Sequence, residues 1–234
     1  MANFVRHETI MDFENKPQLG MGIYTPREIA DILKMDYAKV NRWISAYWDG
    51  ELGKEFESCY SWKVDGSKAV SFHTFVELYV MMRFSESGVR TRKILEAHKL
   101  LGQKYNSPFP FALQEVLNGI STDGKKIFLK DKEGNIITLD GTKQLNLSII
   151  ELFFKKLEFD SGSLASKYYP MGREKQVVMD PKRKFGHPVM GNTNIYPETF
   201  YGMFKAGEPK NYIAALYEVP ERLVQDAIDY CMAA

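Results

Sequence analysis

The strongest constraint on the fold is a pair of short amphipathic segments separated by only three residues. The pair Thr25-Pro26 is typical of a helix start, because threonine caps free amide groups and proline suits the first turn. Asp36 stands at the matching place before a second helix, which is expected to run through Ile44. Two helices joined by the break Lys34–Asp36 must pack against each other across a tight turn.

The side-chain pattern in this region fits a helix-turn-helix. Ala30 is small enough to lie where the second helix crosses the first, and the inner faces carry apolar residues at helical spacing: Ile29, Leu33, Val40 and Trp43. Lys34 stands at the turn position that glycine often holds, so the turn must form without the easiest left-handed residue. A plain helical hairpin in an unrelated fold is the alternative interpretation.

A two-stranded wing is expected to follow the second helix. Asp49-Gly50 and Gly53 indicate turns, and Asp65-Gly66 is a hairpin signal between two strand-like runs. These runs are Tyr60–Val64 and Ala69–Phe72. Two helices are expected next, one from Ser71 or Thr74 that stops at Ser87-Gly88 and one from about Arg90 to Leu101.

The outer face of the second helix has the chemistry to contact double-stranded DNA. Arginine can bond guanine through two hydrogen bonds, asparagine can bond adenine in the same way, and lysine favours phosphate. The candidate DNA-binding residues are Thr25, Tyr37, Ala38, Lys39, Asn41 and Arg42, with Lys63 and Lys68 from the wing. Because the net charge of the chain is only +1, DNA contact must come from a local patch.

The rest of the chain predicts a mainly α fold with small β elements. An antiparallel element is expected around Ile127–Leu129 and Ile136–Leu139, between the turn signals Asp123-Gly124 and Glu133–Asn135, followed by a short helix from Ile149 to Leu157. Residues 160–196 should be mostly loop with short strands, and three helices should cover 197–206, 209–216 and 220–232. The expected units are an arm over 1–22, a winged helix-turn-helix over 23–110, a linking segment over 111–160 and a helical domain over 161–234.

Composition and motifs argue against an enzyme. Cys59 and Cys231 lie far apart, so neither a zinc site nor a disulfide framework is expected. The four histidines have no metal-ligand spacing, and no nucleophile elbow, P-loop or Rossmann fingerprint is present, so we expect no cofactor. The N-terminus has no apolar leader and no apolar run is long enough to cross a bilayer, which makes the cytoplasm the expected location.

The last helix is expected to contact protein rather than DNA. Four acidic residues surround it, with only Arg222 opposing them: Glu218, Glu221, Asp226 and Asp229. The phosphates of DNA would be repelled by such a face. Its apolar residues could serve a partner or dimer interface, or only fill the core of their own domain: Leu223, Val224, Ala227, Ile228 and Tyr230. The basic residues Lys182–Lys184, with Arg173 and Lys175, could touch phosphate or an acidic partner, or be solvated.

Two stretches resemble known families. The N-terminal segments Tyr24–Ala30, Val40–Ile44, Val70–Phe72 and Gly88–Arg90 resemble the winged helix-turn-helix of MerR-like regulators, and more closely the N-terminal domain of a class of VapB-like antitoxins. The C-terminal segments Gly186–Ile195, Ala206–Glu208, Ala214–Tyr217 and Val224–Tyr230 resemble domain of unknown function four-three-three. Asn194 departs from the pattern of that domain, which usually has arginine there, and the usual Gly-Thr pair is split by Asn192.

The resemblance implies an antitoxin or a related transcriptional regulator. Such antitoxins bind their own operator as dimers and hold a PIN-domain ribonuclease toxin inactive. Two alternatives remain open, which are a stand-alone transcriptional regulator and a protein-interaction adaptor that does not bind DNA.

Overall fold

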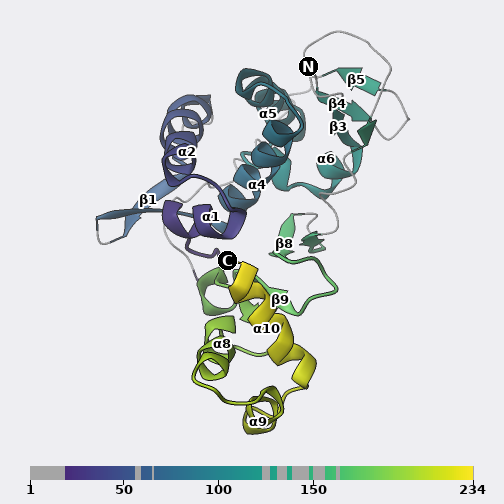
Figure 1. Ribbon diagram of the computed structural model, residues 1–234. Helices are drawn as coiled ribbons and strands as arrows, with labels where there is room; N and C mark the ends of the chain where they lie inside the picture. The colour runs from purple at the N-terminus through teal and green to yellow at the C-terminus, as the bar shows by residue number, and fades with distance from the viewer. Residues whose placement is uncertain are drawn as a thin grey trace, which may run out of the picture.

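The computed structural model describes residues 19–55, 59–64, 66–122, 127–130, 136–138, 148–149, 156–161 and 164–233. The fold is mainly α-helical with small antiparallel strand pairs, as the sequence predicted. Figure 1 shows the N-terminal helices in its upper part and the C-terminal helices below them. The expected arm falls almost entirely on residues 1–18, which lie outside the described residues.

The first two helices form as the sequence predicts. Helix α1, Pro26–Leu33, begins with a reciprocal capping box between Thr25 and Glu28. It ends at Lys34, whose backbone is left-handed at φ 56° and ψ 46° although the residue is not glycine. Helix α2, Tyr37–Arg42, begins where Asp36 Oδ1 accepts a hydrogen bond of 2.9 Å from Lys39 N. The expected caps and the expected turn are thus confirmed.

The turns expected at Asp49-Gly50 and Gly53 are wrong. The chain continues from α2 directly into a π-helix, Trp43–Leu52, and a single turn of α-helix, α3, Gly53–Glu55. Trp43 and Trp48 are both buried although they are five residues apart. The wider turn of a π-helix brings residues at that spacing toward one face, so core packing overrides the turn propensity of Asp49-Gly50.

The expected hairpin is confirmed, but the return strand ends at Val70 and not at Phe72, because Ser71 caps the next helix and Phe72 begins it. Strands β1, Ser61–Val64, and β2, Ser67–Val70, pair antiparallel, with Lys63 opposite Lys68. Gly66 in the loop has a φ of +79°, which glycine adopts without strain. Tyr24 bridges Val70 on the other side of β2, through two backbone hydrogen bonds of 2.9 and 3.0 Å.

Two long helices form the centre of the main core. Helix α4, Phe72–Glu86, is capped by Ser71, and α5, Thr91–Tyr105, extends four residues beyond the predicted end at Leu101. The expected stripe of α5 is buried: Ile94, Leu95, Ala97 and Leu101. Glu77 and His98 meet inside this core, with 2.7 Å between Oε2 and Nε2, and burial raises the pKa of the Glu77 carboxyl.

The central segment folds against these helices as a small sheet. The segment begins with a 3₁₀ turn, Pro110–Ala112, and helix α6, Gln114–Gly119. Four strands follow: β3, Ile120–Thr122, β4, Ile127–Lys130, β5, Ile136–Thr138, and β6, Ser148–Ile149. They are ordered β5-β4-β3-β6 and all pairs are antiparallel, which confirms the expected element. Its two turn signals lie outside the described residues. The helix expected from Ile149 to Leu157 is wrong at both ends, because Ile149 pairs with β3 and Leu157 begins strand β7, Leu157–Phe159.

The C-terminal region has the predicted short strands and three helices. Strand β7 pairs with β8, Ala165–Tyr168, and β9, Val177–Val178, pairs with β10, Val189–Met190. The helices are α8, Pro197–Lys205, α9, Lys210–Leu216, and α10, Glu221–Ala233. They enclose a second core of their own, made of Val177, Met190, Phe200, Ile213, Ala214, Leu223, Val224, Ala227 and Ile228.

A short seam joins the two cores. The hydroxyl of Tyr24 donates a 2.8 Å hydrogen bond to the carbonyl of Gly186, and Ile23 N donates one of the same length to Phe185 O. His187 Nε2 lies 3.7 Å from Glu28 Oε1 on α1. A Cβ on Gly186 would lie 2.0 Å from the Tyr24 hydroxyl oxygen, so only glycine fits here. The turn before β10 therefore contacts the first helix of the N-terminal pair and the residues that precede it.

Candidate nucleic-acid interface

Helix α2 presents a polar outer face to solvent. Val40 is its buried residue, packed in the main core, while Ala38, Lys39 and Arg42 are exposed and Asn41 is half-buried. Tyr37 is 47% exposed, which is high for a tyrosine at the start of a packed helix. The ammonium of Lys39 lies 5.0 Å from the ring centre of Trp43, so its stem covers that buried indole while its charge stays in water.

The hairpin beside α2 is fixed by a single carboxylate. Asp49 Oδ1 accepts hydrogen bonds from Tyr60 N at 2.8 Å and Ser61 N at 3.0 Å, and its Oδ2 accepts one from Ser61 Oγ at 2.6 Å. Lys68, on the returning strand, lies 3.5 Å from the same carboxylate. Figure 1 shows the hairpin projecting from the body of the molecule on the side where α2 lies.

The sequence did not indicate this role for Asp49, because its pairing with glycine suggested a turn. One feature of the sequence could have indicated it: Asp49 lies six residues after Trp43 in an apolar helical run. A carboxylate in such a run needs a hydrogen-bond partner. An anchored hairpin keeps a constant position relative to α2, as an interface with a rigid ligand requires.

The remaining wing and cap candidates differ in how free their side chains are. Lys63 is exposed on β1, whereas Lys68 is half-buried and donates a 2.6 Å hydrogen bond to Ser45 Oγ in addition to its ion pair with Asp49. The Thr25 hydroxyl is engaged in the capping box, 2.9 Å from Glu28 Oε2. Thr25 and Lys68 therefore hold the surface in shape, and Lys63 is the candidate that projects from it.

Three of the candidate cations on α2 and the hairpin have no acidic partner among the described residues, unlike three cations on the neighbouring helix α5. On α5, Arg92 and Lys93 both pair with Glu96, and Lys99 pairs with Glu51 across to the π-helix. Within the described part of the chain, no acidic side chain lies within 4.0 Å of Lys39, Arg42 or Lys63. These cations are therefore available to an external anion.

Helix α10 differs from the expectation of an exposed apolar interface. Four of the five candidates, Leu223, Val224, Ala227 and Ile228, are at most 3% exposed inside the C-terminal core. This is the packing role that the sequence left open, and Tyr230 alone of the five is only partly buried. The large apolar side chains that stay exposed on the three C-terminal helices are Phe204 on α8, Tyr212 and Leu216 on α9, and Met232 near the end of α10.

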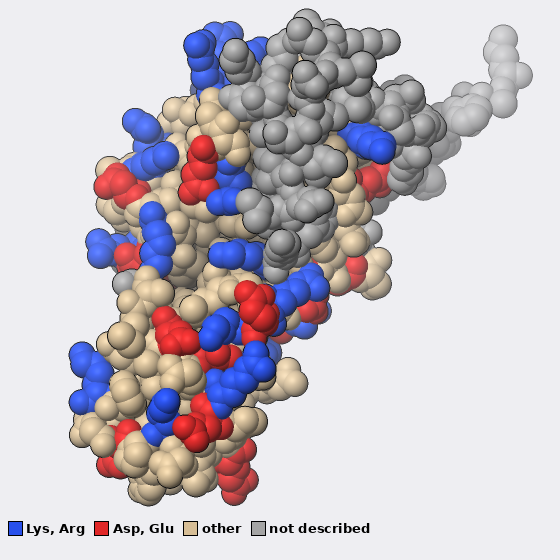
Figure 2. Space-filling view, turned by 45° about the vertical axis from the view of Figure 1, so that its right-hand side comes forward, with Lys and Arg blue, Asp and Glu red and all other residues tan. Residues whose placement is uncertain are grey.

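The acidic charge around α10 is also partly neutralised. Lys175 Nζ lies 3.0 Å from Asp226 Oδ1 and 2.8 Å from Asp229 Oδ2. The sequence had indicated Arg222 as the only cation opposing these acids, so Lys175 is a second one. This contact holds the pKa of the Asp229 carboxyl below its usual value. Figure 2 shows acidic and basic side chains interspersed over the C-terminal part of this face of the molecule.

The basic loop is tied to its own domain. Arg183 donates to Gly191 O at 2.9 Å and to Asn194 Oδ1 at 3.3 Å, so the asparagine that replaces the usual arginine acts as an acceptor for another arginine. Lys184 lies 5.5 Å from the ring centre of Tyr196. Arg173 bonds the Leu157 carbonyl and lies over Tyr169. Among the described residues, no helix is long and apolar enough to span a membrane, and no three metal-binding side chains gather.

Comparisons with known proteins add a family match at the C-terminal end. Residues 177–231, from β9 into α10, match the family described as "Protein of unknown function (DUF433)". The chain is 26% identical to "Uncharacterized protein Rv2308" of Mycobacterium tuberculosis, over 94% of each chain. It is also 26% identical to a protein of the same organism named "Putative antitoxin VapB45", over 70% of this chain and 72% of that protein.

A solved structure has the same overall fold. The crystal structure of Rv2018 from Mycobacterium tuberculosis superposes with a TM-score of 0.64, covering 88% of this chain and 96% of the other. The two sequences are 20% identical, so this likeness concerns the fold. Together with the C-terminal family match, the likeness to VapB45 suggests an antitoxin-like family.

Proposed function

We propose that this chain is a DNA-binding antitoxin that represses its own operon and binds a PIN-domain ribonuclease toxin. The observation that carries the DNA part is the exposed, uncompensated cationic face of α2 beside an anchored hairpin. The toxin part rests on the printed name of VapB45 and on the resemblance of both ends of the chain to such antitoxins.

In this proposal α2 enters the major groove. Arg42 and Asn41 contact base edges, because guanidinium and amide groups match guanine and adenine. Lys39 and Lys63 contact phosphates on either side of the groove. Dimers of the chain bind the two halves of a palindromic operator, as symmetric repressors do.

The toxin would bind away from α2. The exposed apolar side chains Phe204, Tyr212 and Leu216 on the adjoining helices α8 and α9 are the groups that this contact would cover. This assigns DNA to the N-terminal helices and protein to the C-terminal ones.

The test is fluorescence anisotropy with DNA from upstream of the chain's own gene, at two salt concentrations. We expect salt-dependent binding that Arg42→Ala and Asn41→Ala each weaken by about tenfold or more, since a good base contact contributes about 1–3 kcal/mol. Arg92→Ala is the control, because that arginine is exposed on α5 and pairs with Glu96. Absence of salt-dependent binding, or equal affinities for all three variants, would refute the DNA assignment.

A second candidate is an adaptor that binds protein and not DNA. The near-neutral net charge of +1 and the exposed apolar residues of α8 and α9 favour it. Co-expression with the product of the neighbouring gene, followed by size-exclusion chromatography, separates the two. A stable complex without DNA affinity identifies the adaptor, and a complex with DNA affinity supports the antitoxin.

A further inference from the structure

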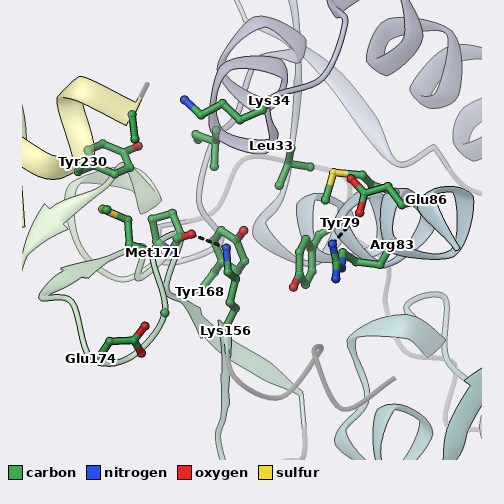
Figure 3. A pocket seen from close by; sticks show the side chains of 15 residues that line it. Leu33, Lys34, Tyr79, Arg83, Glu86, Lys156, Tyr168, Met171, Glu174 and Tyr230 are labelled. Carbon is green, nitrogen blue, oxygen red and sulfur yellow. Dashed lines mark hydrogen bonds and ion pairs between the residues drawn. The ribbon is translucent and has the colours of Figure 1, made fainter. Parts of the chain in front are cut away.

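A cavity of about 490 Å³ lies between the N-terminal helix pair and the C-terminal domain. Its walls come from the end of α1, from one side of α4, from the segment 168–174 and from the end of α10 (Figure 3). This volume is within the range of about 300–1,000 Å³ that small-molecule sites occupy. The cavity is separate from the outer face of α2, and no part of the proposed DNA or toxin surface lines it.

The cavity is lined by aromatic rings and by polarisable thioether groups. Tyr79 and Tyr168 lie with ring centroids 5.1 Å apart and planes tilted by 59°, and Tyr230 faces them from α10. The thioethers of Met82 and Met171 complete the apolar part. Such walls favour a flat, polarisable ring, because aromatic edges and sulfur both pack well against π faces.

Two cations sit in the same cavity without full compensation. Arg83 NH1 pairs with Glu86 at 2.6 Å, but its Nε is buried and has no hydrogen-bond partner among the described residues. Lys156 Nζ donates a 2.6 Å bond to the Pro170 carbonyl, a neutral partner. Burial and the nearby Arg83 lower the pKa of the Lys156 amine, so a bound anion would stabilise its charged form.

The acidic residues of the cavity do not remove this excess. Glu86 is half-exposed and already bonded to Arg83, and Glu174 is exposed at the rim. Both cations are half-buried, and Arg83 has one acidic partner, so what stays unmet is the buried Nε of Arg83 and the charge of Lys156, whose printed partner is a carbonyl. A carboxylate placed beside the guanidinium of Arg83 and the amine of Lys156 would supply the second anion that this pair of cations lacks.

We propose that this cavity binds a small aromatic carboxylic acid. The ring lies beside the half-buried Met171 and Tyr230, over the edges of the buried Tyr79 and Tyr168, and the carboxylate accepts hydrogen bonds from Arg83 and Lys156. The ligand would also touch Leu33 and Lys34, the last residue of α1 and the left-handed residue of the turn before α2. Binding can therefore bias the geometry of the turn that positions α2.

The test uses 2-naphthoate as the probe and neutral 2-naphthamide as its matched control, by isothermal titration calorimetry on the full chain. We expect the acid to bind at least about tenfold more tightly than the amide, since a hydrogen bond to a charged group contributes about that factor. Arg83→Gln and Lys156→Gln should each weaken binding of the acid by about tenfold and leave the amide unchanged. Lys93→Gln, a surface cation outside the cavity, should change neither.

Tyr168→Phe keeps the ring and removes the hydroxyl, so it should preserve most of the affinity. Tyr168→Ala removes the wall and should abolish binding, with circular dichroism used to check that the variant is folded. Equal affinity for acid and amide, no heat with either, or cavity variants that bind like the parent chain would overturn the proposal. None of these measurements uses DNA, so their failure is distinguishable from failure of the proposed operator binding.

Discussion

The two helix pairs near opposite ends of the sequence both turn at a left-handed residue, but their second helices expose different surfaces. Lys34 ends α1 with a φ of 56°, and Glu218, after α9, has a φ of 55°, so neither turn relies on glycine. The helix after the first turn, α2, buries only Val40, whereas α10 buries five residues. A shared backbone device therefore does not specify function, which depends on what the second helix leaves exposed.

Charge sharpens the same contrast. Lys39 and Arg42 lie in the last turn of α2, before the chain continues into the π-helix, and neither pairs with an acid among the described residues. On α10 the acids Asp226 and Asp229 are held by Lys175. The cations of α2 are therefore available to an external anion, whereas the two acids of α10 form ion pairs within the chain.

The largest expected effect tests whether the apolar face of α10 is core or interface. Leu223→Ala should cost about 2–5 kcal/mol of the free energy of unfolding, because Leu223 is 3% exposed in a packed core. Leu216→Ala, at 55% exposure on α9, should change stability by less than about 0.5 kcal/mol. Denaturant unfolding at two protein concentrations measures both. A loss at Leu223 that depends on protein concentration would instead indicate a dimer interface.

The next effect concerns the seam between the two cores, where Tyr24 contacts Gly186. Gly186→Ala should destabilise the chain by about 2–4 kcal/mol, because the φ of +88° strains alanine and the new Cβ would lie 2.0 Å from the Tyr24 hydroxyl oxygen. Gly202→Ala is the matched control, with no atom within 4 Å of its Cβ inside α8. It should stabilise the chain by about 0.5–1 kcal/mol. Thermal unfolding of both variants measures the difference, and a neutral Gly186→Ala would contradict the seam.

Local sequence signals predicted both helix pairs, and long-range contacts escaped them. The caps Thr25 and Asp36 and the left-handed Lys34 follow from neighbouring residues, so periodicity and cap chemistry were sufficient. Asp49 was misread because its partners, Tyr60 and Ser61, lie across the hairpin.

The buried Glu77–His98 pair and the bond from Tyr24 to Gly186 were likewise hidden, because the latter joins residues 162 positions apart. The tyrosine-lined cavity exists only where α1, α4, the segment 168–174 and α10 meet, so no local pattern could indicate it.

A smaller effect is expected at the start of α2. Asp36→Ala removes the acceptor for Lys39 N and should cost about 1 kcal/mol. Asp31→Ala, which removes an exposed ion pair with Arg27 on α1, should cost less than about 0.5 kcal/mol. If α2 is the DNA-contacting helix, Asp36→Ala should also weaken operator binding, whereas Asp31→Ala should not. Equal stability losses for the two aspartates would show that the cap is not formed in solution.

The smallest expected effect lies in the two turns themselves. A non-glycine residue in the left-handed conformation costs about 1–2 kcal/mol, which glycine avoids. Glycine also makes the unfolded chain more flexible, and this offsets part of the benefit. Lys34→Gly and Glu218→Gly should therefore each raise the free energy of unfolding by about 0.5 kcal/mol. Lys34→Ala keeps the strain and should give no gain. Equal gains, measured by chemical denaturation, would show that the turns are equivalent and that α2 and α10 differ only in their surfaces. A gain at Glu218 without one at Lys34 would mean that the Lys34 side chain itself stabilises the first turn, where it lines the cavity.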